Sequence, residues 1–154
     1  MPEKETLERA AADKRAGKSA STQAGEFVRE EIHHVREGKH GARSAKQAIA
    51  IGLSKARRAG VKLGAPPKGA SARTRAAAAR DSAKGRTAPA GTHQKAVSRT
   101  RSRATREALR HEGHAAATPT ALARQAHAAA KKRGPAARAA AARKAARTRA
   151  RRGT

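Results

Sequence analysis

Glutamates and histidines are concentrated between residues 26 and 40: Glu26, Glu30, Glu31, His33, His34, Glu37 and His40. Glu30 and His33 have the Glu-x-x-His spacing of di-iron carboxylate proteins. A di-iron centre needs two such motifs and further glutamates within a four-helix core, which one pair of helices lacks unless it dimerises. Pairing of side chains on an acidic helix surface is the ordinary interpretation. We therefore expect no metal and no cofactor.

Glu31 interrupts an apolar stripe and has more than one interpretation. It could pair with Lys39, Arg43 or Lys46, or it could mark an interface that another protein fills. The chain has no cysteine, no glycine-rich phosphate loop and no Ser-His-Asp arrangement with a scaffold to hold it. The sequence therefore predicts that the protein is not an enzyme.

Three helices are predicted before residue 60. Glu3 to Arg15 forms the first, a segment from Ser19 to Glu37 the second, and a segment from Ser44 to about Ala59 the third. Ser44 and Gln47 match a capping box at the start of the third helix. Each helix is followed by a glycine suited to a C-terminal cap, at positions 17, 38 and 60.

The second and third helices are expected to pack as a helical hairpin. The small residues Ala48, Gly52 and Ala56 share one face of the third helix, which would let the two helices approach closely. The seam between them is filled by apolar side chains: Phe27, Ile32, Val35, Ile49 and Leu53. Ile51 points away from this seam, so it could be a stray exposed residue, a contact with the first helix, or a contact for a protein partner.

The motif KQAIAIGLSKA at residues 46–56, preceded by FVREEI at 27–32 and GKHG at 38–41, resembles a small uncharacterised domain of bacterial and phage proteins. The resemblance covers about residues 19–63. It implies a small module in a bacterial setting and assigns no activity.

Charge is unevenly distributed along the chain. Residues 1–37 hold eight acidic and seven basic residues, whereas residues 38–154 hold 30 basic and three acidic ones. Such an excess predicts a polyanionic partner, and neutralising phosphates releases counterions, so nucleic acid can be bound without reading bases. Only 14 residues are Leu, Ile, Val, Phe or Met, which predicts extensive disorder outside the hairpin.

The segment after Leu63 is alanine-rich and basic, with 22 basic residues between positions 70 and 154. Thr118-Pro119 and Gly134-Pro135 mark latent helix boundaries, and repulsion between arginines one turn apart should be relieved by phosphates, so helices should form on binding. The composition of about residues 65–154 resembles the tails of bacterial histone-H1-like proteins. That resemblance implies DNA condensation with little sequence preference, although arginine dominates here where lysine is usual.

The sequence therefore predicts a mostly α protein with extensive disorder, in which a small αα-hairpin precedes a partly helical, low-complexity tail. The expected parts are an N-terminal helix (1–18), the hairpin module (19–63), a linker (64–71) and the basic tail (72–154), which is disordered or helical on binding. We expect a cytoplasmic, nucleoid-associated protein that binds and compacts double-stranded DNA, with no membrane insertion. The alternatives are an RNA- or ribosome-associated protein, or an adaptor whose hairpin binds a protein or a second copy while the tail binds nucleic acid.

The residues expected to contact nucleic acid are basic side chains of the third helix and the tail: Lys46, Lys55, Arg57, Arg58, Arg73, Arg75, Arg99, Arg101, Arg103, Arg106, Lys131, Lys132, Arg133, Arg143, Lys144, Arg147, Arg149, Arg151 and Arg152. Ile51 is the candidate protein contact. Base-specific readout is not expected, because Phe27 is the single aromatic residue and the hairpin needs it.

Overall fold

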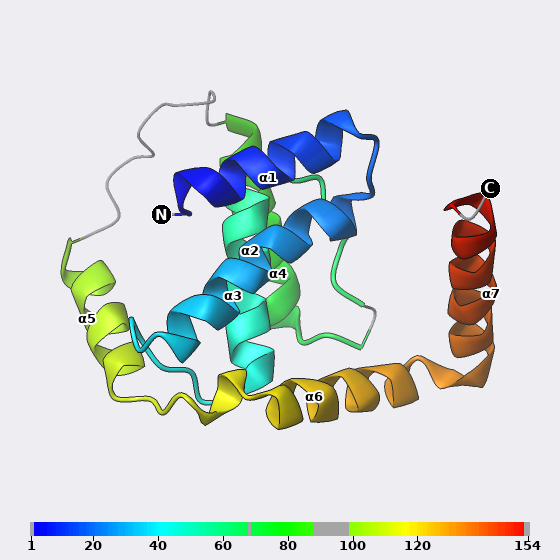
Figure 1. The fold of residues 1–154 in the computed structure, drawn as a ribbon. Helices are drawn as coiled ribbons and strands as arrows, with labels where there is room; N and C mark the ends of the chain where they lie inside the picture. Colours follow the sequence, from blue (N-terminus) through cyan, green and yellow to red (C-terminus); the bar gives the residue numbers. More distant parts are fainter. Residues whose placement is uncertain (1, 68, 88–98, 153–154) are drawn as a thin grey trace. The chain divides into compact units, whose positions relative to one another are not determined.

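Every regular element that the structure describes is helical, which confirms the predicted fold class. The computed structural model describes residues 2–67, 69–87 and 99–152. Its elements are α1 (Lys4–Arg15), α2 (Ala20–Arg36), α3 (Ala45–Arg58), α4 (Ala72–Thr87), α5 (Arg99–Arg110), the 3-10 helix η1 (Ala115–Ala117), α6 (Pro119–Lys132) and α7 (Gly134–Arg152) (Figure 1). The expectation of extensive disorder is only partly supported, because the described residues of the basic tail are mostly helical.

The predicted caps define the ends of α2 and α3. The Ser19 hydroxyl accepts a hydrogen bond from the Thr22 amide (3.3 Å), and the Ser44 hydroxyl accepts one from the Gln47 amide (3.2 Å). At the end of α2, Gly38 has φ of +73°, and the amide of Lys39 donates to the His34 carbonyl (3.0 Å). This is a Schellman cap, which needs a residue that tolerates positive φ and which directs the chain back towards α3.

α1, α2 and α3 form the centre of the first unit, Met1–Thr118. Phe27 and Val35 of α2 are almost fully buried, as are Ala48 and Ala56 of α3. At the crossing of α2 and α3, a Cβ placed on Gly52 would lie 2.7 Å from the Cα of Val28, so the two backbones approach as closely as the small residues predicted.

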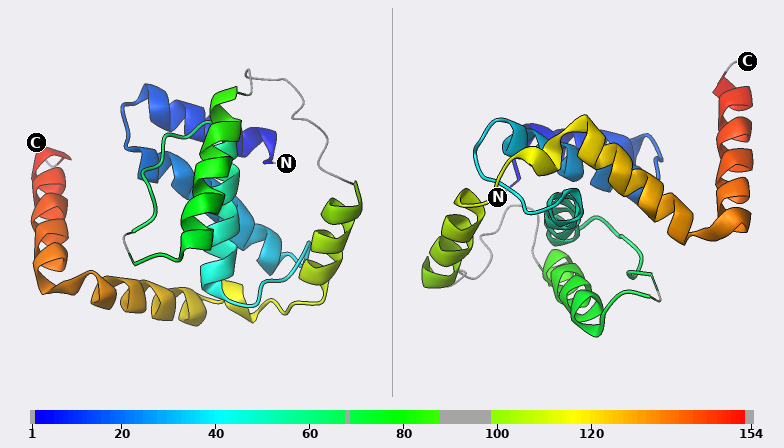
Figure 2. Two further views of the ribbon diagram at one scale, coloured as in Figure 1. Left: turned by 180° about the vertical axis from the view of Figure 1, so that it is seen from behind. Right: turned by 90° about the horizontal axis from the view of Figure 1, so that it is seen from below.

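α4 runs alongside α3, a contact that the sequence did not predict (Figure 2). Asp81 anchors it by accepting a hydrogen bond from the Ser54 hydroxyl (2.6 Å) and pairing with the Arg58 guanidinium (2.7 Å). A Cβ on Gly85 would lie 2.0 Å from the carbonyl oxygen of Arg57, so close backbone packing also holds the C-terminal end of α4, one turn after Asp81.

The chain returns to the turn between α2 and α3 after α5. The amide of Gly41 donates to the Leu109 carbonyl (2.8 Å), and the amide of Ala42 donates to the Gly113 carbonyl (3.0 Å). η1 then packs on α2 and α3, with Ala117 fully buried and its carbonyl accepting from the Arg36 guanidinium (2.9 Å). The first unit therefore extends well beyond the hairpin.

α6 and α7 make up the second unit, Pro119–Thr154. α6 begins at Pro119 directly after the extended Thr118, and α7 begins at Gly134, whose φ is +78°, so the two predicted boundaries are where the helices start. Among the helices described, none combines the length and the apolar character that crossing a membrane requires.

Candidate functional site

The acidic and histidine side chains of α2 separate into an inward and an outward group. Glu30, Glu31 and His34 are buried, whereas His33 is 68% exposed and pairs with Glu37 on the surface (3.3 Å). The predicted Glu30-x-x-His33 motif is therefore not a ligand set, because its two side chains lie on different sides of the helix. The Glu-x-x-His pair that faces inward is shifted by one residue, to Glu31 and His34.

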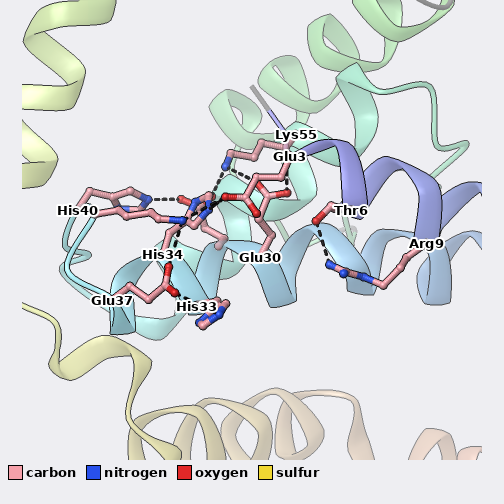
Figure 3. Close-up of polar contacts among 11 residues, drawn as sticks. Glu3, Thr6, Arg9, Glu30, His33, His34, Glu37, His40 and Lys55 are labelled. Atoms are coloured by element: carbon pink, nitrogen blue, oxygen red, sulfur yellow. Dashed lines mark hydrogen bonds and ion pairs between the residues drawn. The ribbon is translucent and has the colours of Figure 1, made fainter.

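Glu31, His34 and His40 form a compact group, which we call the His–Glu cluster. One ligand atom from each of the three residues lies within 4.8 Å of the others. His40 approaches from the turn after α2, its Nε2 lies 3.0 Å from Glu31 Oε1, and its ring meets that of His34 edge to face with the centroids 6.1 Å apart (Figure 3). The sequence left the partner of Glu31 open; in the structure Glu31 is a member of this cluster and lies against His40.

Lys55 of α3 reaches Glu30 of α2 (Figure 3) and pairs with both buried carboxylates of that helix. Its Nζ is 2.6 Å from Glu31 Oε2 and 3.1 Å from Glu30 Oε1. Burial acts to lower the pKa of Lys55, but the hydrogen bonds and negative charges of Glu31 and Glu30 outweigh it and leave the pKa raised. Lys55 is therefore the cation that the two buried carboxylates share.

Glu30 connects the Lys55 pair to the N-terminal segment. Its Oε2 accepts a hydrogen bond from the Glu3 amide (3.1 Å), and the Thr6 side chain is also hydrogen-bonded to it. Burial raises the pKa of Glu30, but the hydrogen bonds from Thr6, Lys55 and Glu3 and the charge of Lys55 bring it below its ordinary value. Glu30 is thus held as a carboxylate.

Glu3 closes the outer side of this network. Its Oε1 lies 2.9 Å from His34 Nε2 and 3.1 Å from Lys39 Nζ. The hydrogen bond with His34, followed by the hydrogen bond and charge of Lys39, lowers the pKa of Glu3 from 4.5 to about 2. The segment before α1 is in this way tied to the end of α2.

We predict that Glu3→Gln weakens the dependence of stability on acid pH. The pKa of Glu3 is lower in the folded chain, so its ionisation stabilises the fold above pH 4.5 and that contribution is lost as pH falls from 4.5 towards about 2. The variant should be less stable than the wild type at neutral pH, with the difference disappearing across this window in urea titrations at several pH values. Glu8→Gln, on the exposed side of α1, controls for the loss of one charge; an equal effect there would contradict the prediction.

The four candidate nucleic-acid contacts on α3 have different surroundings. Lys55 is directed inward, Arg58 pairs with Asp81, and the Arg57 guanidinium donates to the Gly64 carbonyl (3.3 Å). Lys46 is exposed near the start of the helix. α3 is thus covered by α2 on one side and by α4 on another, which leaves little of it for a groove of DNA.

Ile51 is half-buried. It lies one turn before Ser54 and two turns before Arg58, the two residues that bond Asp81 of α4. Its side of α3 is therefore the side on which α4 packs.

The candidate basic residues of the tail lie on helices, apart from Arg133 in the turn between α6 and α7, and they are exposed wherever their side chains are described. Those with described, exposed side chains are Arg73, Arg75, Arg103, Arg106, Lys131, Lys132, Arg133, Arg143, Lys144, Arg147, Arg149 and Arg151. Arg143, Arg147 and Arg151 are spaced by four residues along α7, and with Ala140, Lys144 and Thr148 they line one shallow hollow on its surface. Three further candidates, Arg99, Arg101 and Arg152, have side chains outside the described part of the structure.

Part of the first unit is similar to a known protein family. Residues 12–69 match a family of unknown function, DUF6496. This match supports the resemblance of the hairpin region to an uncharacterised small domain, and the matched segment runs from the end of α1 through α2 and α3 to a point before α4. No curated protein and no solved structure matches the chain.

The matched segment contains all three residues of the His–Glu cluster. It also contains Lys55, which was predicted from the sequence to contact nucleic acid. The position of Lys55 on α3 could have indicated that its side chain is directed inward. Ala48, Gly52 and Ala56 define the face that packs on α2, and Lys55 follows Gly52 by three residues, so it projects beside that face.

Proposed function

We propose that the protein binds double-stranded DNA without sequence preference, through the basic helices α6 and α7 of the second unit, and acts as a compacting, histone-H1-like protein of the bacterial nucleoid. The observation that carries this proposal is the charge of the second unit. Residues 119–154 contain 11 basic residues and no acidic residue. No carboxylate side chain of this unit can pair with these cations, so a polyanion is their natural partner.

The acidic residues of the preceding segment are largely engaged elsewhere. Asp81 pairs with Arg58, and Glu112 lies 3.3 Å from the Arg43 guanidinium. Two of the three carboxylates between residues 70 and 154 thus face basic residues of the α2–α3 region and do not offset the charge of the tail. This distribution favours a division of labour between a folded first unit and a basic second unit.

α7 is long enough to lie along many phosphates of a DNA duplex. A helix of 19 residues is about 28 Å long, and the same length of duplex carries roughly 17 phosphate charges at about one per 1.7 Å. α7 has seven basic residues, and four of them, Arg143, Lys144, Arg147 and Arg151, share one face, so each of these four can find a phosphate on a duplex lying alongside. Bound phosphates would also relieve the repulsion between arginines spaced by four residues and so stabilise the helix.

The test is fluorescence anisotropy of a 20-bp duplex across a salt series, comparing two variants of the full chain. Arg143, Arg147 and Arg151 are replaced together by glutamine in the first variant, and the exposed Lys4, Lys14 and Arg15 of α1 in the second. The two variants lose the same charge. We expect the first to reduce the slope of log K against log salt by about 2.7, or roughly 0.9 per phosphate contact, and the second to change it little.

Two outcomes would contradict the proposal. Equal changes in the two variants would show that net charge, and not the tail, governs affinity. If a structured RNA of the same length displaces the duplex at a much lower concentration than unlabelled duplex does, the partner is RNA.

A further inference from the structure

The His–Glu cluster has the ligand chemistry of a zinc site. Two imidazole nitrogens and one carboxylate oxygen, all within 4.8 Å, match the ligand types that bind Zn²⁺ in proteins with three side chains and an open fourth position. Imidazole suits zinc and disfavours Mg²⁺ and Ca²⁺, which prefer oxygen ligands. We propose that Glu31, His34 and His40 bind a zinc ion whose fourth ligand is water. This site is independent of the nucleic-acid binding proposed for the tail.

The distances within the cluster are near those of a tetrahedral site. Ligand atoms at about 2.0–2.1 Å from zinc lie about 3.3 Å apart at the corners of a tetrahedron. His40 Nε2 and Glu31 Oε1 are already 3.0 Å apart, and a ring nitrogen of His34, whose Nε2 also lies 2.9 Å from Glu3 Oε1, is within 4.8 Å of the ligand atoms of both. Binding the ion therefore requires the three ligand atoms to draw together, to about 3.3 Å.

One hydrogen bond and one ion pair from outside the cluster already hold two of the three ligands. His40 Nδ1 donates to the Gly41 carbonyl (3.0 Å), which leaves Nε2 as the nitrogen directed at Glu31. A metal-binding histidine usually makes such a bond with its second nitrogen. Lys55 Nζ holds the other oxygen of Glu31, Oε2, at 2.6 Å, so the carboxylate is fixed with Oε1 towards the histidines.

The backbone around His40 is also fixed. Gly38 caps α2, and the amides of Gly41 and Ala42 are bonded to carbonyls of residues 109 and 113. His40 is thus presented by a turn that is restrained on both sides. A rigid ligand loses little conformational entropy when it binds an ion.

Charge balance is compatible with a divalent ion. Glu31 Oε1 and His40 Nε2 are 3.0 Å apart, and a zinc ion bound between them would leave Lys55 with Glu30 at 3.1 Å. Glu30, Glu31 and Glu3 carry three negative charges in the immediate surroundings, against the positive charges of Lys55 and Lys39. The net negative charge favours addition of a cation.

The experiment titrates ZnCl₂ into the full chain, without nucleic acid, by isothermal titration calorimetry, and repeats the titration with Co²⁺ to record its visible absorption. We expect one zinc per chain, a rise in the melting temperature that EDTA reverses, and an intense cobalt spectrum typical of four-coordinate geometry. His40→Gln keeps a hydrogen-bond donor towards Glu31 but removes a ligand. It should weaken zinc binding by at least roughly tenfold, the smallest loss seen when even an outer partner of a metal ligand is removed.

His33→Gln is the matched control, because His33 neighbours the cluster in sequence but lies on the exposed side of α2. It should bind zinc as the wild type does. Circular dichroism of each variant without metal verifies that the fold is retained. The proposal is overturned if wild type shows no zinc-dependent rise in melting temperature, or if His40→Gln and His33→Gln bind zinc equally well. Neither result would bear on duplex affinity, which is measured separately.

Discussion

Replacing Gly52 by valine should lower the free energy of unfolding of the first unit by about 3 kcal/mol or more. Even a Cβ at this position would lie 2.7 Å from the Cα of Val28 and 3.0 Å from the Phe27 carbonyl oxygen. These are backbone atoms of α2, so they cannot move aside without separating the two helices. Valine adds two methyl groups to the same space. A urea titration followed by circular dichroism should show the cooperative transition at a much lower denaturant concentration.

Gly25→Val is the matched control for this substitution. Gly25 is an exposed residue inside α2, and a Cβ there would meet nothing within 4 Å. Because valine is slightly better than glycine in a helix interior, the control should leave stability within about 0.5 kcal/mol of the wild type or raise it. Similar losses at Gly52 and Gly25 would mean that the helix crossing is not as close as described.

The local features of the fold could be predicted from the sequence. Ser19, Ser44 and Gly38 act through contacts with residues three to five positions away, so their capping roles are readable without knowledge of the tertiary structure. The small face of α3 was readable for a similar reason, because helical periodicity places Ala48, Gly52 and Ala56 together.

The packing of α4 could not be predicted in the same way. Composition assigns residues 72–87 to a solvated basic tail, and the alanine face of α4 gives little indication of what it packs on. The contact depends on one carboxylate, Asp81, which meets Ser54 and Arg58 across more than 20 residues of sequence. One acidic residue in a basic segment is a weak indication of helix packing, although the sequence does show that Asp81 stands alone among basic residues.

The candidate cluster shows the same limit. The sequence showed that residues 26–40 are rich in possible ligands, but the spacing that it singled out was that of Glu30 and His33, and surface pairing with no metal was the expectation. The choice between that pair and Glu31 with His34 depends on which side of α2 is buried, and the crossing with α3 decides this. Lys55 becomes the partner of Glu31 for the same reason, in place of the predicted Lys39, Arg43 or Lys46.

Replacing Lys55 by methionine should destabilise the first unit by about 3–5 kcal/mol at neutral pH. The side chains of Glu30 and Glu31 are only 2% and 1% exposed, and Lys55 is the lysine that reaches both. Methionine preserves much of the apolar stem but leaves two neighbouring carboxylates buried without this cation. Removing one partner of a buried ion pair lowers the free energy of unfolding by more than the intact pair adds to it, because the remaining charge stays buried without compensation.

Lys46→Met, which removes a lysine from an exposed position of the same helix, is the control and should change stability by no more than about 0.5 kcal/mol. Adding Glu31→Gln to Lys55→Met should recover part of the loss, since one of the two buried negative charges is then neutral. Urea titrations of the three variants separate the interpretations. A loss at Lys55 that Glu31→Gln restores identifies buried charge as its cause, whereas equal effects of Lys55→Met and Lys46→Met would mean that Lys55 is a surface residue and is available to phosphate after all.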